Sequence, residues 1–522
     1  MSRLYPFADD SMLGREAGTP GNVKGTTLLA AEARRLGLQP AGENGTYFQT
    51  LPYKTRTTDS ASTVRVGGAT LAHGADFFAV GLRAARQLAA PVVFGGTLGD
   101  PARMLPAEQG AGKVVVYQVP LTPAALRRLQ GASPAPRALA IVFVGLDQFF
   151  PILRQQTSGE FVDDSAKTAE ARQAPPALFV TRDAGARFFG APLDGLAPGT
   201  AGRAADLDVR IAVTPSAHPA RNVVAVLPGR DPALRGQYVA VGAHNDHVGT
   251  TARPVDHDSV RIFNRIVRPQ GADDEGKVAT AAEQAQVNAE LAAWRAAHPN
   301  SARLDSIYNG ADDDGSGSAT VLEVAERLAA LPTKPRRSVL FVWHTGEEKG
   351  LLGSEWFTDH PTVPRDSIVA QLNLDMVGRG AATDVTGETK DGQAIRGGPH
   401  YVQLVGSRRL STEFGDLVEA VNRDGRHGLA FDYSLDADGH PQNIYCRSDH
   451  YSYARYGIPV VFFTTGGHAD YHQVTDEAQY LDYTRMARVG NLVADVAVRV
   501  ADLDHRVRVD KPKPEPGASC RQ

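Results

Sequence analysis

Two patterns of hydrophobic and polar residues divide the chain. Between about Ser60 and Leu207, short apolar runs are separated by Gly, Pro and Ala, which is typical of a small strand-rich domain. From about Asn222 onward, longer apolar runs alternate with segments of helical periodicity. This alternation predicts an α/β fold, with a mostly parallel (mixed) sheet sandwiched by helices.

The second pattern also locates individual elements. Its expected strands are VVAVLPG, YVAVGAH, SVLFVWH, IVAQLNLD and PVVFFTT. Apolar residues fall on one helical face in Ser316–Leu331 and in Thr484–Val500. Near the N-terminus, Thr27–Leu36 is expected to be helical, and Lys277–His298 reads as a mostly exposed helix inside a long connection.

These patterns predict four segments. Residues 1–58 and 208–505 are expected to form the main domain, which carries a long insert at about 250–308. Residues 59–207 are expected to form a separate β-rich domain inserted into it. Residues 506–522 are predicted to be a flexible tail, because the stretch from Lys511 is rich in proline.

Composition excludes several classes of protein. The 522 residues carry a formal net charge of −4, from 55 basic and 59 acidic residues, which gives no support for binding nucleic acid or an anionic membrane. No apolar run approaches the roughly 18 residues that span a bilayer. The two cysteines, Cys446 and Cys520, imply no disulfide framework, and a single bridge between them is left open.

Candidate chemistry lies in polar patches of the C-terminal half, most of which follow an apolar run. In chain order they are AHNDHVG (Ala243–Gly249), NGADDDGSG (Asn309–Gly317), HTGEEKG (His344–Gly350), NLDMVGR (Asn373–Arg379) and ADYHQVTD (Ala469–Asp476). In open α/β sheets, ligands bind outside the carboxyl ends of the strands. Together the patches hold the imidazoles, the shareable carboxylate and the free carboxylate that two metal ions and a water require.

Two details of the patches suggest how they divide this work. Glu347 and Glu348 are adjacent, so their side chains diverge in an extended loop, and one can bind metal while the other holds the water. A metal-binding histidine usually donates its other ring N–H to a carboxylate. Position in the sequence favours Asp246 as that partner for His244, and Asp476 for His472.

Other residues of the patches have simpler interpretations. Ser448, Asp449 and His450 are adjacent and cannot form a serine triad, and no GxSxG elbow occurs. The remaining histidines near the patches are expected to support the ligands or the fold: His247, His344, His450 and His468.

With these motifs in this order, the chain resembles the co-catalytic zinc aminopeptidases. That family also includes glutamate carboxypeptidase, the glutaminyl cyclases and the catalytically inactive transferrin receptors. The resemblance covers about residues 220–500 and extends to the N-terminal segment DDSMLGREAGTPGN. It implies a fold of the zinc-peptidase type, and the β-rich region is similar to the protease-associated domain inserted in such enzymes.

The resemblance implies a set of ligands for two Zn²⁺ ions per chain. His244 and Asp375 would bind one ion, Glu348 and His472 would bind the other, and Asp313 would bridge both. Because three acidic residues stand side by side, Asp312 is the next candidate for the bridge.

The resemblance also implies the residues around the metals. A cis peptide bond is expected between Asp313 and Asp314, and Asp246, Asp314 and Asp476 are expected to support the ligands. Glu347 would be the general base, and the hydroxyl of Tyr471 would steady the oxyanion.

The implied activity is hydrolysis of the N-terminal residue from peptide substrates. A carboxypeptidase or dipeptidase of the same family is the alternative, with Arg379 and Arg447 as candidates to hold a substrate carboxylate. A glutaminyl cyclase is disfavoured by the full set of ligands for two metals. A receptor-like binding protein is disfavoured because all five ligands and Glu347 are present.

Two features depart from the family. The interval between His244 and Asp313 is unusually long, and we hypothesise that the insert forms a lid or a subunit contact. Asn245 stands where aromatic or aliphatic residues are usual. Relatives with the β-rich domain are often exported, so a periplasmic or secreted protein without its signal peptide is expected, with a cytoplasmic location as the alternative, since MSRLYPFADDSM has no apolar core.

Overall fold

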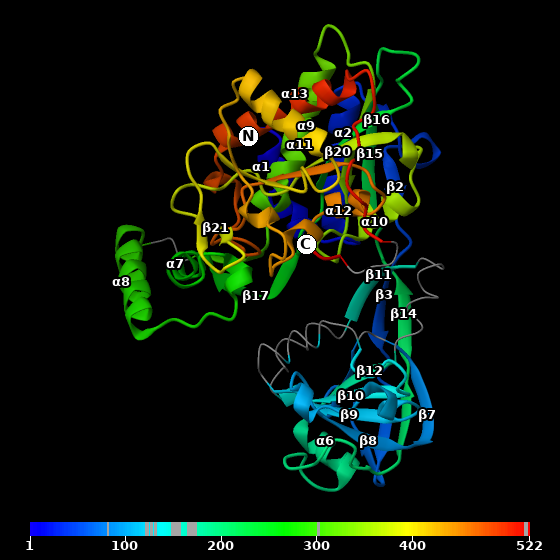
Figure 1. Ribbon diagram of the computed structural model, residues 1–522. Helices are drawn as coiled ribbons and strands as arrows, with labels where there is room; N and C mark the ends of the chain where they lie inside the picture. Colours follow the sequence, from blue (N-terminus) through cyan, green and yellow to red (C-terminus); the bar gives the residue numbers. More distant parts are fainter. Residues whose placement is uncertain are drawn as a thin grey trace. The chain divides into compact units, whose positions relative to one another are not determined.

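The computed structural model describes residues 1–80, 83–120, 125, 129, 133–147, 158–163, 175–299, 303–515 and 520–522. The chain forms two compact units: one comprises Met1–Leu51 and Ala217–Gln522, and the other Pro52–Ser216 (Figure 1). The predicted β-rich insertion, 59–207, lies within the second unit. The N-terminal segment belongs to the first unit, where Arg15 is fully buried and donates hydrogen bonds to the carbonyl oxygens of Asn309 and Gly310.

In the described part of the chain, the first unit contains one nine-stranded mixed sheet. Its order is β1-β15-β19-β16-β20-β25-β23-β24, and β2 also pairs with β15. Strands β19, β16, β20 and β25 run parallel to one another, so their carboxyl ends lie at one edge. The bounds are β1 Gln39–Pro40, β2 Phe48–Thr50, β15 Arg221–Leu227, β16 Tyr238–His244, β19 Ser338–His344, β20 Ile368–Leu374, β23 Tyr401–Val405, β24 Ala430–Asp432 and β25 Val460–Thr464.

Helices cover both faces of this sheet, as the sequence predicted. Alternate residues of β19 show the two sides: Phe341 and Trp343 belong to the core formed with α2, α9, α11 and α13, whereas Leu340 and Val342 pack with α10 and α12. The helices are α1 Leu4–Phe7, α2 Pro20–Arg35, α9 Gly317–Ala329, α10 Leu352–Asp359, α11 Thr412–Asp424, α12 His450–Ala454 and α13 Tyr483–Ala501. Helix α2 begins well before the predicted Thr27, because Pro20 suits a first helical turn.

The long insert has structure of its own. Strands β17 (Thr250–Asp256) and β18 (Leu304–Ile307) pair at its base. Between them lie α7 (His257–Val267), a 3₁₀ turn (Gly271–Asp274) and α8 (Ala281–Ala297), which is mostly exposed as predicted. A small hydrophobic cluster that includes Ile262 and Val287 joins α7 to α8. A hairpin of β21 (Val385–Glu388) and β22 (Ala394–Arg396) completes the first unit.

The second unit is strand-rich, as its sequence predicted. Its described sheets have the orders β6-β12-β10-β9-β8, β5-β4-β13-β7 and β11-β3-β14. The bounds are β3 Tyr53–Thr58, β4 Thr63–Val66, β5 Ala69–Leu71, β6 Phe77–Val80, β7 Ala85–Ala90, β8 Val92–Thr97, β9 Val114–Gln118, β10 Ala140–Val144, β11 Ser158–Val162, β12 Ala177–Val180, α6 Arg182–Phe189, β13 Ala205–Val209 and β14 Ile211–Pro215.

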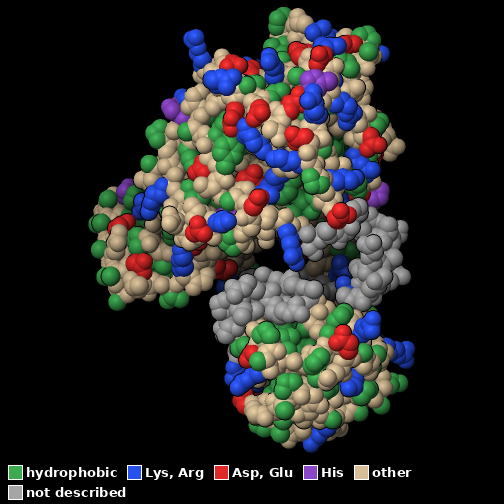
Figure 2. Space-filling model, in the orientation of Figure 1, with side chains coloured by type: hydrophobic (Ala, Val, Ile, Leu, Met, Phe, Trp, Pro, Cys, Tyr) green, Lys and Arg blue, Asp and Glu red, His purple; other side chains and the backbone are tan. Residues whose placement is uncertain are grey.

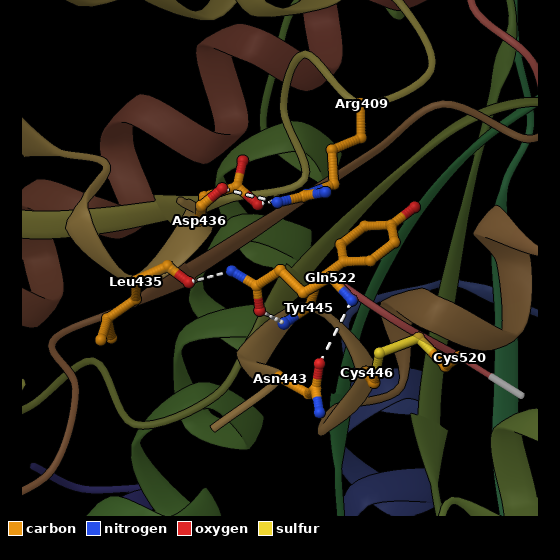
Figure 3. Close-up of a disulfide and its surroundings, with 8 residues drawn as sticks. All are labelled: Arg409, Leu435, Asp436, Asn443, Tyr445, Cys446, Cys520 and Gln522. Carbon is orange, nitrogen blue, oxygen red and sulfur yellow. Dashed lines mark hydrogen bonds and ion pairs between the residues drawn. A yellow bond between two sulfur atoms is a disulfide. The ribbon is translucent and has the colours of Figure 1, made fainter. Parts of the chain in front are cut away.

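The tail differs from its prediction. Val507 packs into the main core, and the backbone N–H of Asp510 donates to the carbonyl oxygen of Leu410. Cys520 forms a disulfide with Cys446, with a Cα–Cα distance of 5.8 Å (Figure 3). The side-chain oxygen of Gln522 accepts a hydrogen bond of 2.9 Å from the backbone N–H of Tyr445. The prediction of a flexible tail was therefore wrong for these residues, since specific bonds that a Pro-rich composition does not reveal hold them; residues 516–519 lie outside the described part.

Among the described residues, no helix is long and apolar enough to cross a lipid bilayer. On the face of the first unit shown in Figure 2, basic and acidic side chains are interspersed, in keeping with the near balance of charge.

Candidate metal centre

The predicted ligands meet in two groups that share one residue. His244, Asp313 and Asp375 form the first group, and Asp313, Glu348 and His472 belong to the second, which also contains His247. Within each group, one potential ligand atom per residue lies within 4.8 Å of the others. Asp313 is the common member, which is the arrangement that a bridging carboxylate needs.

The distances divide the two oxygens of Asp313 between the two groups. Its Oδ1 lies 3.0 Å from Nε2 of His244, and its Oδ2 lies 2.9 Å from Nε2 of His472. His244 Nε2 is also 3.6 Å from Oδ1 of Asp375, and His472 Nε2 is 3.0 Å from Oε2 of Glu348. The two imidazoles therefore face opposite oxygens of one carboxylate.

The sheet explains why these residues meet. His244 ends β16, Asp375 directly follows β20, and Glu347 and Glu348 come shortly after β19. Because these strands are parallel neighbours, their carboxyl ends deliver the side chains to one edge. His472 arrives from the loop after β25, the next parallel strand.

The turn Ala311–Ser316, which leads into α9, presents Asp313. The predicted cis peptide bond between Asp313 and Asp314 is present. The carboxylate of Asp476 accepts hydrogen bonds from the backbone N–H groups of Asp312 (3.0 Å) and Asp313 (3.1 Å). The fold of this turn is thus tied to the loop that carries His472.

The neighbouring acids of the triplet have different partners. Oδ2 of Asp314 accepts from the N–H of His244 at 3.1 Å, and its Oδ1 accepts from the N–H of Met376 at 3.2 Å, so this carboxylate joins the ends of β16 and β20. Asp312 instead accepts from the N–H of Gly378 at 2.7 Å and lies 3.2 Å from Nε2 of His468. The geometry therefore favours Asp313 over Asp312 as the bridge.

Two expected partnerships differ from the structure. Nδ1 of His244 lies 3.1 Å from the backbone oxygen of Asp246 and 3.8 Å from its carboxylate, which accepts from the N–H of Glu347 instead. Asp476 bonds the Asp313 turn, as described above, and not His472. In both cases the carboxylate positions backbone rather than an imidazole ring, because the chain folds back and offers N–H groups that no linear spacing predicts.

The structure adds His247 to the second group of potential ligands. His247 was expected to play a supporting or structural role, and its Nδ1 lies 2.6 Å from Oε1 of Glu348 and 3.8 Å from Oδ2 of Asp313. Its ring is also edge-on to that of His472, with centroids 5.3 Å apart. The motif HNDH, with a second histidine three residues after the first, was the available signal.

The remaining histidines and the unusual asparagine lie outside the two groups. His344 contacts Asp449, and His450 stacks on Phe462. Asn245 hydrogen-bonds Asn22 and the backbone oxygen of Trp343, so its amide is directed away from the ligands. Ser448, from the apparent triad, donates to Asp375 at 2.8 Å.

The donor set fits divalent metal ions, in particular zinc. Imidazole nitrogens and carboxylate oxygens are ligands that zinc accepts readily. Nε2 of His247 is buried and has no hydrogen-bond partner among the described residues. Burial raises the pKa of the Asp313 carboxyl, but His244 and His472 outweigh it and hold that pKa well below its ordinary value. The bridging position is therefore suited to an ionised carboxylate.

A cavity of about 90 Å³ opens beside the two groups. Asp313, Asp375, Glu347 and Tyr471 line one part of it. Burial, followed by the charges of Asp375 and Glu348, raises the pKa of Glu347 well above its ordinary value despite the opposing effect of His244. The apolar part of the wall comes from Met376, Leu435, Ile444 and Phe462.

Backbone strain is concentrated at the same place. Met376, directly after Asp375, has φ of 58°, and His472 has φ of 53°. Residues other than glycine seldom adopt this left-handed region, and such residues cluster at functional sites. The oxygen of Met376 accepts from the N–H of Thr465 at 2.7 Å, which helps to hold the strained turn.

The two candidate arginines differ in position. Arg379 forms an ion pair of 2.8 Å with Asp470 and is nearly buried, whereas Arg447 lines the cavity. Arg447 is paired with Asp273 of the insert at 3.3 Å.

Known proteins resemble this chain in sequence. It is 28% identical to leupeptin-inactivating enzyme 1 of Streptomyces exfoliatus over 197 residues, which cover 36% of this chain and 38% of that protein. It is 36% identical to leucine aminopeptidase 1 of Coccidioides posadasii (strain C735) over 160 residues, 29% of this chain and 36% of that protein. The matches thus span less than half of the length of these curated relatives.

Two solved structures align over nearly the whole chain at low identity. BSAP, a zinc aminopeptidase from Bacillus subtilis, is 16% identical with a TM-score of 0.47, covering 95% of this chain and 93% of that one. An aminopeptidase from Aneurinibacillus sp. strain AM-1 is 16% identical with a TM-score of 0.49, covering 98% and 97%. The sequence model of peptidase family M28 matches residues 222–497, more than half of the chain and all the predicted ligands described above. The chain belongs to peptidase family M28.

Proposed function

We propose that this protein is a metal-dependent exopeptidase, specifically an aminopeptidase that removes N-terminal residues from peptides. The observation that carries the proposal is the position of Asp313, whose two oxygens face His244 and His472, with Glu347 on the wall of the adjoining cavity. Membership of peptidase family M28 supports the same reaction class.

The proposal assigns two Zn²⁺ ions per chain to the two groups. His244, Asp313 and Asp375 would hold one ion, and Asp313, Glu348 and His472 the other. When bound, such ions act as Lewis acids that polarise a carbonyl group and lower the pKa of water to about 7. His247 either binds the second ion or fixes Glu348 through its contact of 2.6 Å.

Glu347 is the general base in this proposal. Its raised pKa makes the carboxylate a better proton acceptor than an ordinary glutamate. It takes the proton of the attacking water on a carboxylate oxygen, and then returns it to the nitrogen of the leaving amine. The hydroxyl of Tyr471 donates to the oxyanion, and burial raises the pKa of Tyr471, so the group stays protonated.

The arginines support an aminopeptidase over a carboxypeptidase. A carboxypeptidase of this type needs a cation that is available to a substrate carboxylate. Asp470 pairs with Arg379, and Asp273 pairs with Arg447, the arginine that lines the cavity. An enzyme that acts from the N-terminus requires no such cation.

An exported location forms part of the proposal. The disulfide between Cys446 and Cys520 supports it, because disulfides persist in oxidising compartments such as the periplasm or the extracellular space.

Hydrolysis of a panel of aminoacyl-p-nitroanilides, with free and with blocked amino groups, tests the proposal. Wild-type protein loaded with zinc should cleave only the unblocked substrates. Glu347→Gln should retain the metals and lose about 100- to 10,000-fold in kcat, the range for a general base. Cleavage of blocked substrates, or unchanged kcat in Glu347→Gln, would contradict the proposal.

A further inference from the structure

The insert Thr250–Ile307 supplies part of the wall beside the metal ligands. Its 3₁₀ turn brings Gln270 and Asp273 to the cavity that Glu347 and Asp313 also line. The family motifs do not include these residues, since they lie in the unusually long connection between His244 and Asp313. The insert is therefore placed to act on whatever group enters the cavity.

The turn is fixed against the loop that carries His472. The N–H of Ala272 donates to the backbone oxygen of Tyr471 at 3.1 Å. Gly271 has φ of +58°, and a Cβ there would lie 2.5 Å from the same oxygen, so only glycine permits this approach. Within the turn, the N–H of Gln270 donates to the carboxylate of Asp274 at 3.0 Å.

The rest of the insert is attached to the same loop by charged groups. Arg303 pairs with Glu477 at 2.7 Å, and the guanidinium of Arg261 lies 3.6 Å from the ring centroid of Tyr480. The position of Asp273 is thus set by several contacts around it.

The partner of Asp273 is equally well placed. Arg447 stands between Cys446, which forms the disulfide with Cys520, and Ser448, which donates to the ligand Asp375. Its guanidinium lies 3.3 Å from Oδ1 of Asp273. Among the described residues that line the cavity, Arg447 is the one basic side chain, and apolar side chains form the wall beside it.

We infer that Asp273 is a specificity-determining residue. Asp273 pairs with Arg447 and so cancels the positive charge at the cavity. The cavity then accepts an uncharged, apolar N-terminal side chain of the substrate. An acidic side chain meets no available cation and is repelled by the Asp273 carboxylate. Without that carboxylate, Arg447 can receive an aspartate or glutamate side chain in a charge-assisted hydrogen bond. This inference rests on the proposed aminopeptidase function.

The test compares leucyl- and glutamyl-p-nitroanilide as substrates of the zinc-loaded full chain. In Asp273→Asn, the ratio of kcat/KM for the glutamyl over the leucyl substrate should rise at least about tenfold, the scale of one charge-assisted contact. The double variant Asp273→Asn with Arg447→Gln should lose that gain. Glu275 also lies in the insert but does not line the cavity. The control variant Glu275→Gln removes its negative charge and should leave the ratio unchanged. A ratio within threefold of wild type in Asp273→Asn, or a gain that survives the loss of Arg447, overturns the inference.

A binding measurement separates this inference from the proposed function. Calorimetric titration with L-leucine and L-glutamate needs no turnover, so it applies even if the wild type cleaves neither substrate and the proposed function fails. Asp273→Asn should then bind L-glutamate, relative to L-leucine, at least about tenfold more tightly than wild type. An unchanged preference would refute the specificity role on its own.

Discussion

Asp313 and His472 contact each other at 2.9 Å although Asp313 lies in the second and His472 in the last of the five polar patches. Asp313 sits in a turn before α9, and His472 in the loop after β25. The Asp476 carboxylate joins these two segments, because it accepts the N–H groups of Asp312 and Asp313. The proposed metal-binding geometry therefore depends on a loop-to-loop contact as much as on strand order.

Asp313→Asn should abolish binding of both metal ions, because the amide cannot bridge two cations as a carboxylate does. Metal content by atomic emission should fall from about two ions per chain to well below one, and peptidase activity should be lost. Asp312→Asn is the matched control: it removes an adjacent carboxylate that contacts Gly378 and His468, so metal should still bind. Full metal content in Asp313→Asn would show that another acid is the bridge.

His247→Ala should weaken the second metal site selectively. Its imidazole contacts Glu348 at 2.6 Å, and loss of such a partner or ligand typically costs about 10- to 100-fold in metal affinity. Competition for zinc with a chelator that reports zinc binding should show one site with a weakened zinc affinity and one site with an unchanged affinity. His450→Ala, which removes a buried histidine stacked on Phe462, should leave both affinities unchanged if it folds. Equal weakening of both sites by His247→Ala would contradict the assignment to the second group.

Removal of the metals should destabilise the first unit. Without cations, the Asp313, Asp375 and Glu348 carboxylates repel one another and Nε2 of His247 lacks a hydrogen-bond partner. Zinc at 100 times its dissociation constant should add about 2.7 kcal/mol per site. Calorimetry with chelator, followed by zinc titration, should give a Tm that falls and then rises with zinc concentration. A Tm independent of zinc would mean that these groups do not bind it.

Attachment of the insert should weaken in acid. Burial raises the pKa of Glu477, but His257 and Arg303 outweigh it, so the pKa lies below its ordinary value. The folded state thus favours the ionised form of Glu477. The contribution of this carboxylate to the attachment of the insert is complete above about pH 4.3, and it is lost as the pH falls through the lowered pKa of Glu477. Native-state hydrogen exchange, corrected for the intrinsic rate at each pH, should show α7 opening more readily below that range.

Glu477→Gln provides the control for this pH effect. It should open α7 more readily already at neutral pH and remove most of the extra opening in acid. An α7 whose protection in the wild type does not change with pH would contradict a role for this carboxylate.

Loss of the disulfide should loosen one wall of the cavity. Cys446 and Cys520 close a loop with a sequence separation of 74, and Cys446 adjoins Arg447. Cys520→Ser should lower the free energy of unfolding by about 2–4 kcal/mol, because the unfolded chain is no longer constrained. Denaturant unfolding measures this, and reduced wild type should match the variant. Equal stability of oxidised wild type and Cys520→Ser would show that the bond does not form in solution.

The sequence by itself determined the sheet, its covering helices and most of the residues that meet at the candidate metal centre. Apolar runs such as SVLFVWH are buried on both faces of a sheet, so they are recognisable as strands without any partner. His244 and Asp375 stand directly at strand ends, and parallel strands bring such positions to one edge whatever the loops do. These features depend on local pattern and on the order of elements, both of which are written along the chain.

Only the tertiary structure decided which acid of the triplet faces the histidines and which groups Asp246 and Asp476 contact. It also placed His247 in the second group and brought Asp273 to Arg447. It also brought Cys520 to Cys446, although the Pro-rich composition had predicted a flexible tail. Each of these is a contact between loops distant in sequence. Loop positions follow from backbone N–H groups finding acceptors and charges finding partners in three dimensions, and linear spacing does not encode those partners.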